Sequence, residues 1–341
     1  MKSVEVLNEE RSAGTIALDL AVVDLAKFEA AEGEERAHMA AAFDKGMREI
    51  GFGVITGHGL PAGLFQRVLD VTRGLFDLPL TEKAEISSRV AEGQFCGWVP
   101  FAADAASRVY GAKSDTPADL RERFRAVISN CDEVRQKVGP NQWPQSLPEV
   151  RETWTEYYKL MEHVGARVMR LAAASLGLSD WYFDEYFQRH FSVMMATHSP
   201  PFNGVAQPGQ SRCGAHTDTG TMTFVYQPNT RGGLEVQIDG QWRVPMPPEG
   251  SFVVNCGDLL ARWTNDRWRS TVHRVGGPGA PLRERRQSLV FFHQPALDVK
   301  LHCVPTCTDA RTPPRYAPIT LREHFTHQQQ LLATRDVSIA S

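Results

Sequence analysis

Apolar residues in the first half of the chain recur at helical spacing. In residues 34–50 they fall at Met39, Phe43, Met47 and Ile50, and the pattern ends at Gly51. The longest such pattern covers residues 148–177, and a further helical stretch covers residues 62–90. An apolar side chain at every third or fourth position forms a stripe on one face of a helix. We therefore predict helices over these three ranges.

Beyond about residue 190 the pattern changes to short apolar runs separated by turn signals. The runs cover residues 192–196, 221–226, 234–238, 241–244, 251–255, 288–293 and 299–302, and an earlier one covers 52–55. Asp239-Gly240 lies between two of these runs and is a strong signal for a two-residue hairpin. The pattern predicts a helical front half packed on a β-rich back half, the β part being a sandwich or barrel.

Composition and charge exclude several classes of protein. The 341 residues contain 42% hydrophobic and 23% charged residues, typical values for a globular protein with a packed core. A net charge of −3 argues against a nucleic-acid partner. There is no apolar run of about 18 residues, the length of a membrane-spanning helix, and the first residues lack the apolar region of a signal peptide. Six cysteines in a chain of this length are expected to be thiols in a reducing cytoplasm.

A candidate metal site begins in the segment GAHTDTG. His216 and Asp218 are two residues apart, a spacing that puts both side chains on one face of an extended strand. A third group stands at His273, in the strand-like run RSTVHRV. Two imidazoles and one carboxylate form the facial triad of non-haem iron(II), which leaves coordination sites open for chemistry. Zinc is the rival metal, but the His-Glu-x-x-His signature of zinc hydrolases is absent from the sequence.

A second pair of residues indicates a bound carboxylate. Arg286 and Ser288 lie at the start of a predicted strand and share one face of it. A guanidinium inside an otherwise apolar barrel needs an anionic partner. A dicarboxylate that chelates iron at one end and meets Arg286 and Ser288 at the other end satisfies both sets of residues.

These motifs together resemble a known family. The stretches AHTDTGTMTFVYQ, RWRSTVHRV and RRQSLVFFHQP are similar to the isopenicillin N synthase-like family of Fe(II)/2-oxoglutarate-dependent oxygenases, and GFGVITGHGLP is similar to the family's N-terminal entry. The resemblance covers roughly residues 40–300. It implies a double-stranded β-helix (jelly roll) with N-terminal and flanking helices, an α+β fold with a mainly β core. We expect a helical region over 1–190 that packs on the barrel, the jelly-roll core over 191–310, and a C-terminal segment over 311–341.

The resemblance also implies the chemistry. Fe(II) would be held by His216, Asp218 and His273, and 2-oxoglutarate by Arg286 and Ser288, with O₂ as the second co-substrate. The expected enzyme is a dioxygenase that hydroxylates, desaturates or cyclises a small molecule, which the family's habits suggest is a specialised metabolite. No side chain beyond the metal ligands needs to act as a catalyst.

One position departs from the family pattern. Family members have a tyrosine shortly before a proline in the strand that helps to hold the co-substrate, and here Ser199 precedes Pro200. Serine is too short to reach the same point. His198, a water molecule or a weaker hold on the co-substrate are the alternatives.

Two other functions remain open from the residues alone. One is an oxidase that uses iron and O₂ without 2-oxoglutarate, as the family's namesake does. The other is a non-catalytic metal- or ligand-binding barrel. Among the remaining conspicuous side chains, we expect His58, Trp263 and Trp268 to have structural roles, and His293 to face either the core or the pocket.

Overall fold

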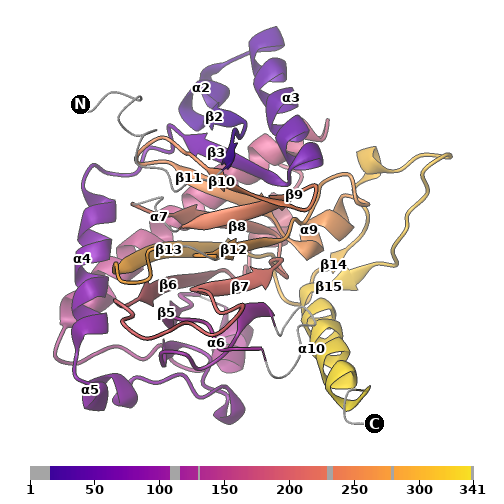
Figure 1. The fold of residues 1–341 in the computed structure, drawn as a ribbon. Helices are drawn as coiled ribbons and strands as arrows, with labels where there is room; N and C mark the ends of the chain where they lie inside the picture. Colours follow the sequence, from indigo (N-terminus) through magenta and orange to yellow (C-terminus); the bar gives the residue numbers. More distant parts are fainter. Residues whose placement is uncertain (1–15, 108–115, 130, 229–232, 278–279, 339–341) are drawn as a thin grey trace.

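The computed structural model describes residues 16–107, 116–129, 131–228, 233–277 and 280–338, and its centre is a pair of β-sheets (Figure 1). The larger sheet has eight strands in the spatial order β2 (Val22–Asp24), β3 (Phe52–Thr56), β11 (Phe252–Cys256), β8 (Met222–Tyr226), β13 (Arg286–His293), β6 (Val193–Ser199), β5 (Glu122–Ala126) and β4 (Gly97–Val99). The smaller sheet has the order β1 (Ile16–Leu18), β10 (Gln241–Pro245), β9 (Leu234–Ile238), β12 (His273–Val275) and β7 (Cys213–His216). The expected jelly roll is confirmed.

Helices cover the outer surface of the larger sheet. The long helix α7 runs behind the strands and contacts β13, α3 and α4 (Figure 1). Its apolar stripe, which includes Trp154, Tyr157 and Val168, is fully buried. The helices are α2 (Leu25–Ala30), α3 (Gly33–Glu49), α4 (Leu64–Asp77), α5 (Leu80–Glu85), α6 (Asp132–Val138), α7 (Pro148–Ser175), α8 (Asp184–Phe187), α9 (Asp258–Trp263) and α10 (Leu321–Ser338). In the described part of the chain, no helix combines the length and apolarity needed to cross a bilayer.

The predicted hairpin is confirmed. Strands β9 and β10 pair antiparallel with Ile238 opposite Gln241, so Asp239-Gly240 forms the two-residue loop. Asp239 has φ of 49° and Gly240 has φ of 76°. Positive φ at both positions is the geometry of a type I′ turn, whose twist matches that of the two strands.

The helical stretch predicted over 62–90 is two helices. α4 ends at Asp77 and α5 begins at Leu80. Pro79 between them has no backbone N–H, and a proline also disfavours helical geometry for the residue before it. Leu78 accordingly has ψ of 151°, and the chain changes direction there.

The first 190 residues supply strands as well as helices. β2 and β3 form one edge of the larger sheet, and β4 and β5 form the other. β5 pairs antiparallel with β6, with Glu122 opposite His198. The predicted run at 299–302 contributes only the short β14 (Lys300–Leu301), which pairs with β15 (Ile319–Thr320) outside both main sheets.

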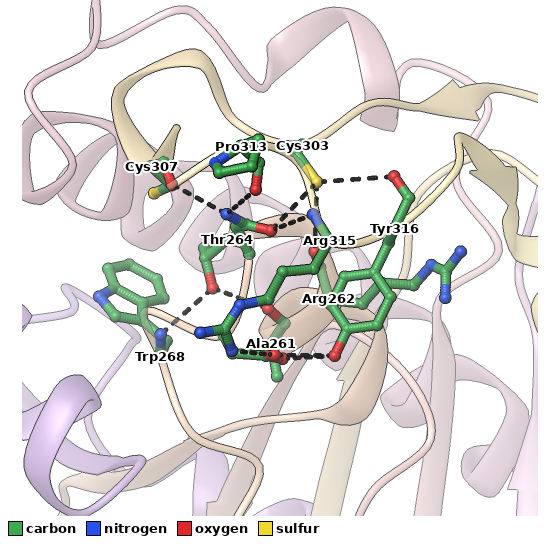
Figure 2. A network of polar contacts seen from close by, with 11 residues as sticks. Ala261, Arg262, Thr264, Trp268, Cys303, Cys307, Pro313, Arg315 and Tyr316 are labelled. Carbon is green, nitrogen blue, oxygen red and sulfur yellow. Dashed lines mark hydrogen bonds and ion pairs between the residues drawn. The ribbon is translucent and has the colours of Figure 1, made fainter. Parts of the chain in front are cut away.

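The turn after α9 contacts the segment that precedes α10. Figure 2 shows the polar contacts, which involve Cys303, Pro313 and Arg315 of that segment. The buried Asn265 has φ of 55°; its amide donates to the carbonyls of Cys307 and Pro313 and accepts from the backbone N–H of Arg315. This turn is flanked by Trp263 and Trp268, which are buried, as expected for packing residues. The side-chain amide of Asn265 thus holds three points of the segment that leads into α10, and this segment is fixed to the turn.

Candidate functional site

The two histidines of the expected triad lie opposite each other on neighbouring strands. His216 ends β7, His273 begins β12, and the two are register partners with ring centroids 4.3 Å apart. Asp218 lies two residues beyond the end of β7, so it does not share a strand face with His216 as the sequence predicted. The chain nevertheless turns its carboxylate back: Asp218 Oδ1 lies 3.8 Å from Nε2 of each histidine.

Hydrogen bonds orient each imidazole. Nδ1 of His216 lies 2.7 Å from the carbonyl oxygen of Gly214, and Nδ1 of His273 lies 3.0 Å from that of Thr271. A carbonyl only accepts, so each Nδ1 carries the proton and donates it. The lone pair is therefore on Nε2 in both rings, the atom directed at Asp218. A metal-binding histidine is commonly fixed in this way.

The carboxylate is oriented by a side chain of the larger sheet. Asn255 Nδ2 donates to Asp218 Oδ2 at 2.7 Å, and both residues are buried. This bond occupies one carboxylate oxygen and leaves Oδ1 on the side of the histidines. The potential ligand atoms of His216, Asp218 and His273 all lie within 4.8 Å of one another.

Burial and the neighbouring charges set the protonation states. Burial lowers the pKa of His273 to about 4 and also lowers that of His216, and Asp218 only partly offsets the effect. Burial alone would raise the pKa of Asp218, but His273, His216 and Asn255 outweigh it and the pKa is lowered. At neutral pH the site therefore holds two neutral imidazoles and one carboxylate, the forms that bind a metal. Such a donor set would occupy one face of an ion, and it fits Fe(II).

Arg286 and Ser288 lie on the inner face of β13, near the triad. Arg286 Nη1 donates to Ser288 Oγ at 3.2 Å, and Nη2 donates to Gln227 Oε1 at 2.8 Å. Nε is buried without an acceptor among the described residues, and no carboxylate there pairs with the guanidinium. Burial, with Arg212 and Arg121 nearby, lowers the pKa of Arg286 to about 10. A buried cation in this position favours the binding of an anion.

His198, one of the three alternatives for the missing tyrosine, does not reach the cavity. That side chain points to the opposite face of β6, where its Nδ1 lies 2.7 Å from Glu122 Oε1. Side chains alternate along a strand, so Thr197 and Ser199 face the cavity and His198 cannot. Thr197 Oγ1 lies 2.6 Å from Ser288 Oγ, and Ser199 is the register partner of Arg286.

Two cavities meet at the triad. A small one of about 70 Å³ is lined by the three triad residues together with Arg286, Ser288 and Ser199. A larger one of about 720 Å³ is also lined by His216 and Asp218 and opens toward β5 and α10. The triad therefore stands between a co-substrate-sized recess and a chamber large enough for a second molecule.

Sequence reasoning missed three arginines of this chamber. Arg121, just before β5, and Arg123 and Arg125 within it line the larger cavity, and Arg121 lines the smaller one as well. The alternation of arginine with Glu122, Phe124 and Ala126 was visible in the sequence as a strand pattern. The predicted strands began only after residue 190, apart from the run at 52–55, so this segment was not among them.

The other histidines have structural roles. His58 bridges a turn, with Nε2 2.7 Å from the carbonyl oxygen of Gly250 and Nδ1 accepting from the N–H of Leu60. His293 faces the core rather than the pocket and stacks on Phe187. Burial lowers the pKa of His293 to about 3, so it is neutral.

Comparison with known proteins agrees with this geometry. The family model described as the 2OG-Fe(II) oxygenase superfamily matches residues 190–295, and the one described as the N-terminal region of a non-haem dioxygenase in morphine synthesis matches residues 20–146. The chain is 35% identical to validamycin A dioxygenase of Streptomyces hygroscopicus subsp. limoneus over 281 residues, which is 80% of this chain and 75% of that protein. The chain belongs to the 2OG-Fe(II) oxygenase superfamily.

Other members support the same assignment. A 2-oxoglutarate-Fe(II) type oxidoreductase, hxnY, of Emericella nidulans is 30% identical over 89% of this chain and 87% of its own length. Among solved structures, a 2OG-Fe(II) oxygenase family protein of Caulobacter crescentus superposes with a TM-score of 0.79 at 28% identity, covering 93% of this chain and all of the other. A full-length Neurospora crassa protein in complex with alpha-KG and thymine gives 0.78 at 25% identity, with 94% and 98% covered. The protein is an Fe(II)/2-oxoglutarate-dependent dioxygenase, with O₂ as its second co-substrate.

Proposed function

We propose that His216, Asp218 and His273 bind Fe(II), and that Arg286 and Ser288 bind the distal carboxylate of 2-oxoglutarate. One observation carries the proposal: Nε2 of His216 and Nε2 of His273 both lie 3.8 Å from Asp218 Oδ1. These three residues line the same small cavity as Arg286. When bound, iron and 2-oxoglutarate supply O₂ activation coupled to the decarboxylation of 2-oxoglutarate to succinate and CO₂. The substrate then gains a hydroxyl group; desaturation and ring closure are alternatives.

The chain's own residues position these groups. Gly214, Thr271 and Asn255 fix the donor atoms of the triad, so the metal geometry is formed in advance. Ser288 and Gln227 hold the guanidinium of Arg286 in place. The apolar walls Val225, Val290 and Phe292 limit water in the small cavity. No general acid or base is needed.

We further propose that the primary substrate is a small molecule of specialised metabolism. Validamycin A dioxygenase and gibberellin 20 oxidase 2 of Oryza sativa, 28% identical over 96% of this chain, carry names that refer to such compounds. The net charge of −3 speaks against a nucleic-acid substrate. The six unpaired cysteines favour a reducing compartment, and we place the enzyme in the cytoplasm.

The test is an anaerobic Fe(II) titration combined with assays of O₂ uptake and succinate formation, run with and without 2-oxoglutarate. We expect one Fe(II) per chain and succinate only when 2-oxoglutarate is present. Asp218→Ala should abolish both, and Asp70→Ala, at an exposed position of α4, is the matched control. O₂ uptake without any need for 2-oxoglutarate would favour the oxidase, and full activity of Asp218→Ala would remove the triad from the proposal.

A further inference from the structure

Strand β5 carries a row of arginines along one wall of the larger cavity. Arg121, Arg123 and Arg125 all line it, while Glu122 between them points to the other side of the sheet. Successive side chains of a strand point to opposite faces, so Arg123 and Arg125 share one face of β5 with their Cα atoms about 6.6 Å apart, and Arg121 directly precedes the strand. The wall that they form begins beside the small cavity, which Arg121 also lines, and continues along β5.

Glu122 keeps the row in this orientation. Its carboxylate accepts hydrogen bonds from Lys83 Nζ at 3.0 Å and Trp98 Nε1 at 2.7 Å, and it lies 2.7 Å from His198 Nδ1. All four residues are buried. A strand anchored so firmly on its outer face cannot turn its arginines away from the cavity.

The three arginines differ in how their charges are balanced. Arg121 pairs with Asp119 at 3.0 Å, and Arg123 pairs with Asp104. Arg125 has no carboxylate partner among the described residues: its Nη2 donates to Ser88 Oγ at 2.8 Å and its guanidinium stacks on the ring of Phe95 at 4.1 Å. Its Nε is buried without an acceptor in the same described part of the chain.

The environment of Arg125 is unfavourable to an unbalanced charge. Burial and the neighbouring Arg123 lower its pKa to about 10. A guanidinium in such a place gains more from an anion than one in water does, because the pair interacts through a medium of lower dielectric. Stacking on Phe95 holds the planar group still, so less entropy is lost when a ligand binds.

We propose that the substrate is a carboxylic acid with an apolar body, and that Arg125, assisted by Arg123, binds its carboxylate. This inference rests on the proposed function, because it concerns the substrate chamber next to the metal triad. Arg125 is half-buried and is the one of the three arginines that no described carboxylate balances, and one such charge favours a monocarboxylate over a phosphate ester. Apolar side chains also line the chamber, namely Phe191, Val193, Met195 and Phe292.

The lining of the two cavities also indicates which end of the substrate faces the metal. His216 and Asp218 line both cavities, whereas Arg125 lines only the larger one. The carboxylate would therefore lie far from the carbon that reacts, with the apolar body reaching inward to the metal. Arg322 on α10 also lines the chamber, but it pairs with Glu133 and is balanced.

The test uses a probe acid and its neutral amide. Anaerobic protein is loaded with Fe(II) and saturating 2-oxoglutarate, which occupies Arg286, and is titrated with 4-phenylbutanoate or 4-phenylbutanamide in a calorimeter. We expect the acid to bind at least about 10-fold more tightly than the amide, the effect of one charged hydrogen-bonded pair. Arg125→Gln should abolish this preference, and Arg125→Lys, which keeps the charge but loses the planar fork, should retain part of it. Arg135→Gln, at an exposed ion pair on α6, is the matched control.

The outcomes separate the two proposals. The Fe(II) and 2-oxoglutarate titrations that precede each run test the proposed function, and their failure in the wild-type protein would overturn it. With both bound, equal affinity for acid and amide, no binding of the acid, or a preference that survives Arg125→Gln would overturn the carboxylate site. Tighter binding of 2-phenylethyl phosphate than of 4-phenylbutanoate would overturn the assignment to a carboxylic acid.

Discussion

Asn255 and Asp218 are joined by a buried hydrogen bond of 2.7 Å that crosses from the larger sheet to the metal triad. The bond takes Oδ2 of the carboxylate and leaves Oδ1 at 3.8 Å from both Nε2 atoms. Asn255 itself lies in β11, between β3 and β8. The position of the carboxylate is therefore set by a central strand and not by the loop that carries Asp218.

This relationship predicts the effect of Asn255→Ala. Without the amide, the carboxylate can rotate, and we expect Fe(II) affinity to fall by about 10- to 100-fold, the usual cost of losing an outer partner of a metal ligand. Anaerobic Fe(II) titration measures it. Thr217→Ala is the control, because that hydroxyl donates to Asp258 rather than to Asp218. A loss of thermal stability with unchanged Fe(II) affinity would show that Asn255 only supports the fold.

The fold could be predicted well where the pattern along the chain was local. The stripe over 148–177, the hairpin at Asp239-Gly240 and the strand runs after residue 190 each correspond to an observed element. The strands β4 and β5 escaped prediction because they are short, and because β5 pairs with β6, far away in sequence, while β4 pairs with β5. Arginine and glutamate also dominate β5, and such residues favour a strand only where each side chain finds a partner in the tertiary structure.

The sequence predicts which residues form the candidate metal site, but it does not predict the groups that orient them. His216, Asp218 and His273 stand out in the sequence because metal ligands are few and chemically distinct. Their orienting groups are backbone carbonyls and Asn255, which carry no such signal. The arrangement at Ser199 was likewise hidden: only the pairing of β5 with β6 shows that His198 faces Glu122, and only the folded structure brings Arg121 to the small cavity.

Arg286 provides a test of the co-substrate site. Removing one member of a desolvated charge pair costs about 2–5 kcal/mol, which corresponds to roughly 30-fold or more in affinity. We expect Arg286→Ala to raise the KM for 2-oxoglutarate by at least about 30-fold and to leave Fe(II) affinity nearly unchanged, and Arg286→Lys to fall between. The adjacent Arg285, which pairs with Asp77 at the surface, gives the control Arg285→Ala. If Arg286→Ala impaired only the primary substrate, the oxidase without 2-oxoglutarate would be the better account.

Ser199 and Arg121 together predict how the co-substrate is held without a tyrosine. Both line the small cavity, and Arg121 Nε is buried without an acceptor among the described residues. We expect Arg121→Ala to raise the KM for 2-oxoglutarate by about 10-fold or more, because a charged donor is lost. Ser199→Tyr alone should also raise it, since the ring and 2-oxoglutarate would compete for the same small cavity.

The double variant Arg121→Ala/Ser199→Tyr tests whether Arg121 takes the place of the missing tyrosine or whether the new ring merely crowds the small cavity. In the Arg121→Ala background the space of the guanidinium is vacated, and Ser199→Tyr should then lower the KM for 2-oxoglutarate. Steady-state succinate formation at varied 2-oxoglutarate measures all three variants, with Ser199→Ala as the control for loss of the hydroxyl. Additive increases in KM in the double variant would mean that Arg121 does not take the place of the tyrosine.

Glu122 predicts a link between stability and pH. Burial alone would raise its pKa, but the bonds to His198, Lys83 and Trp98 outweigh burial and the pKa is lowered from the usual 4.5. A carboxyl with a lowered pKa contributes stability that is fully present above about pH 4.5 and is lost as the pH falls through the folded-state value. We expect Glu122→Ala to reduce the free energy of unfolding by about 3–5 kcal/mol at pH 7, because Lys83 is left as an unpaired buried charge.

The comparison with two further variants makes this prediction specific. Glu122→Gln keeps an acceptor and should cost less than Glu122→Ala, and the difference between each variant and the wild-type protein should shrink below about pH 4.5. Glu156→Gln removes an exposed partner of Arg67 and should change stability by less than about 1 kcal/mol. Urea unfolding between about pH 2.5 and pH 8 measures these values, because the stability is lost only below the usual pKa of 4.5. Glu122 anchors β5, which carries Arg125 and directly follows Arg121. If the destabilisation of Glu122→Ala did not vary with pH, packing and not the charge of Glu122 would hold this wall of the chamber.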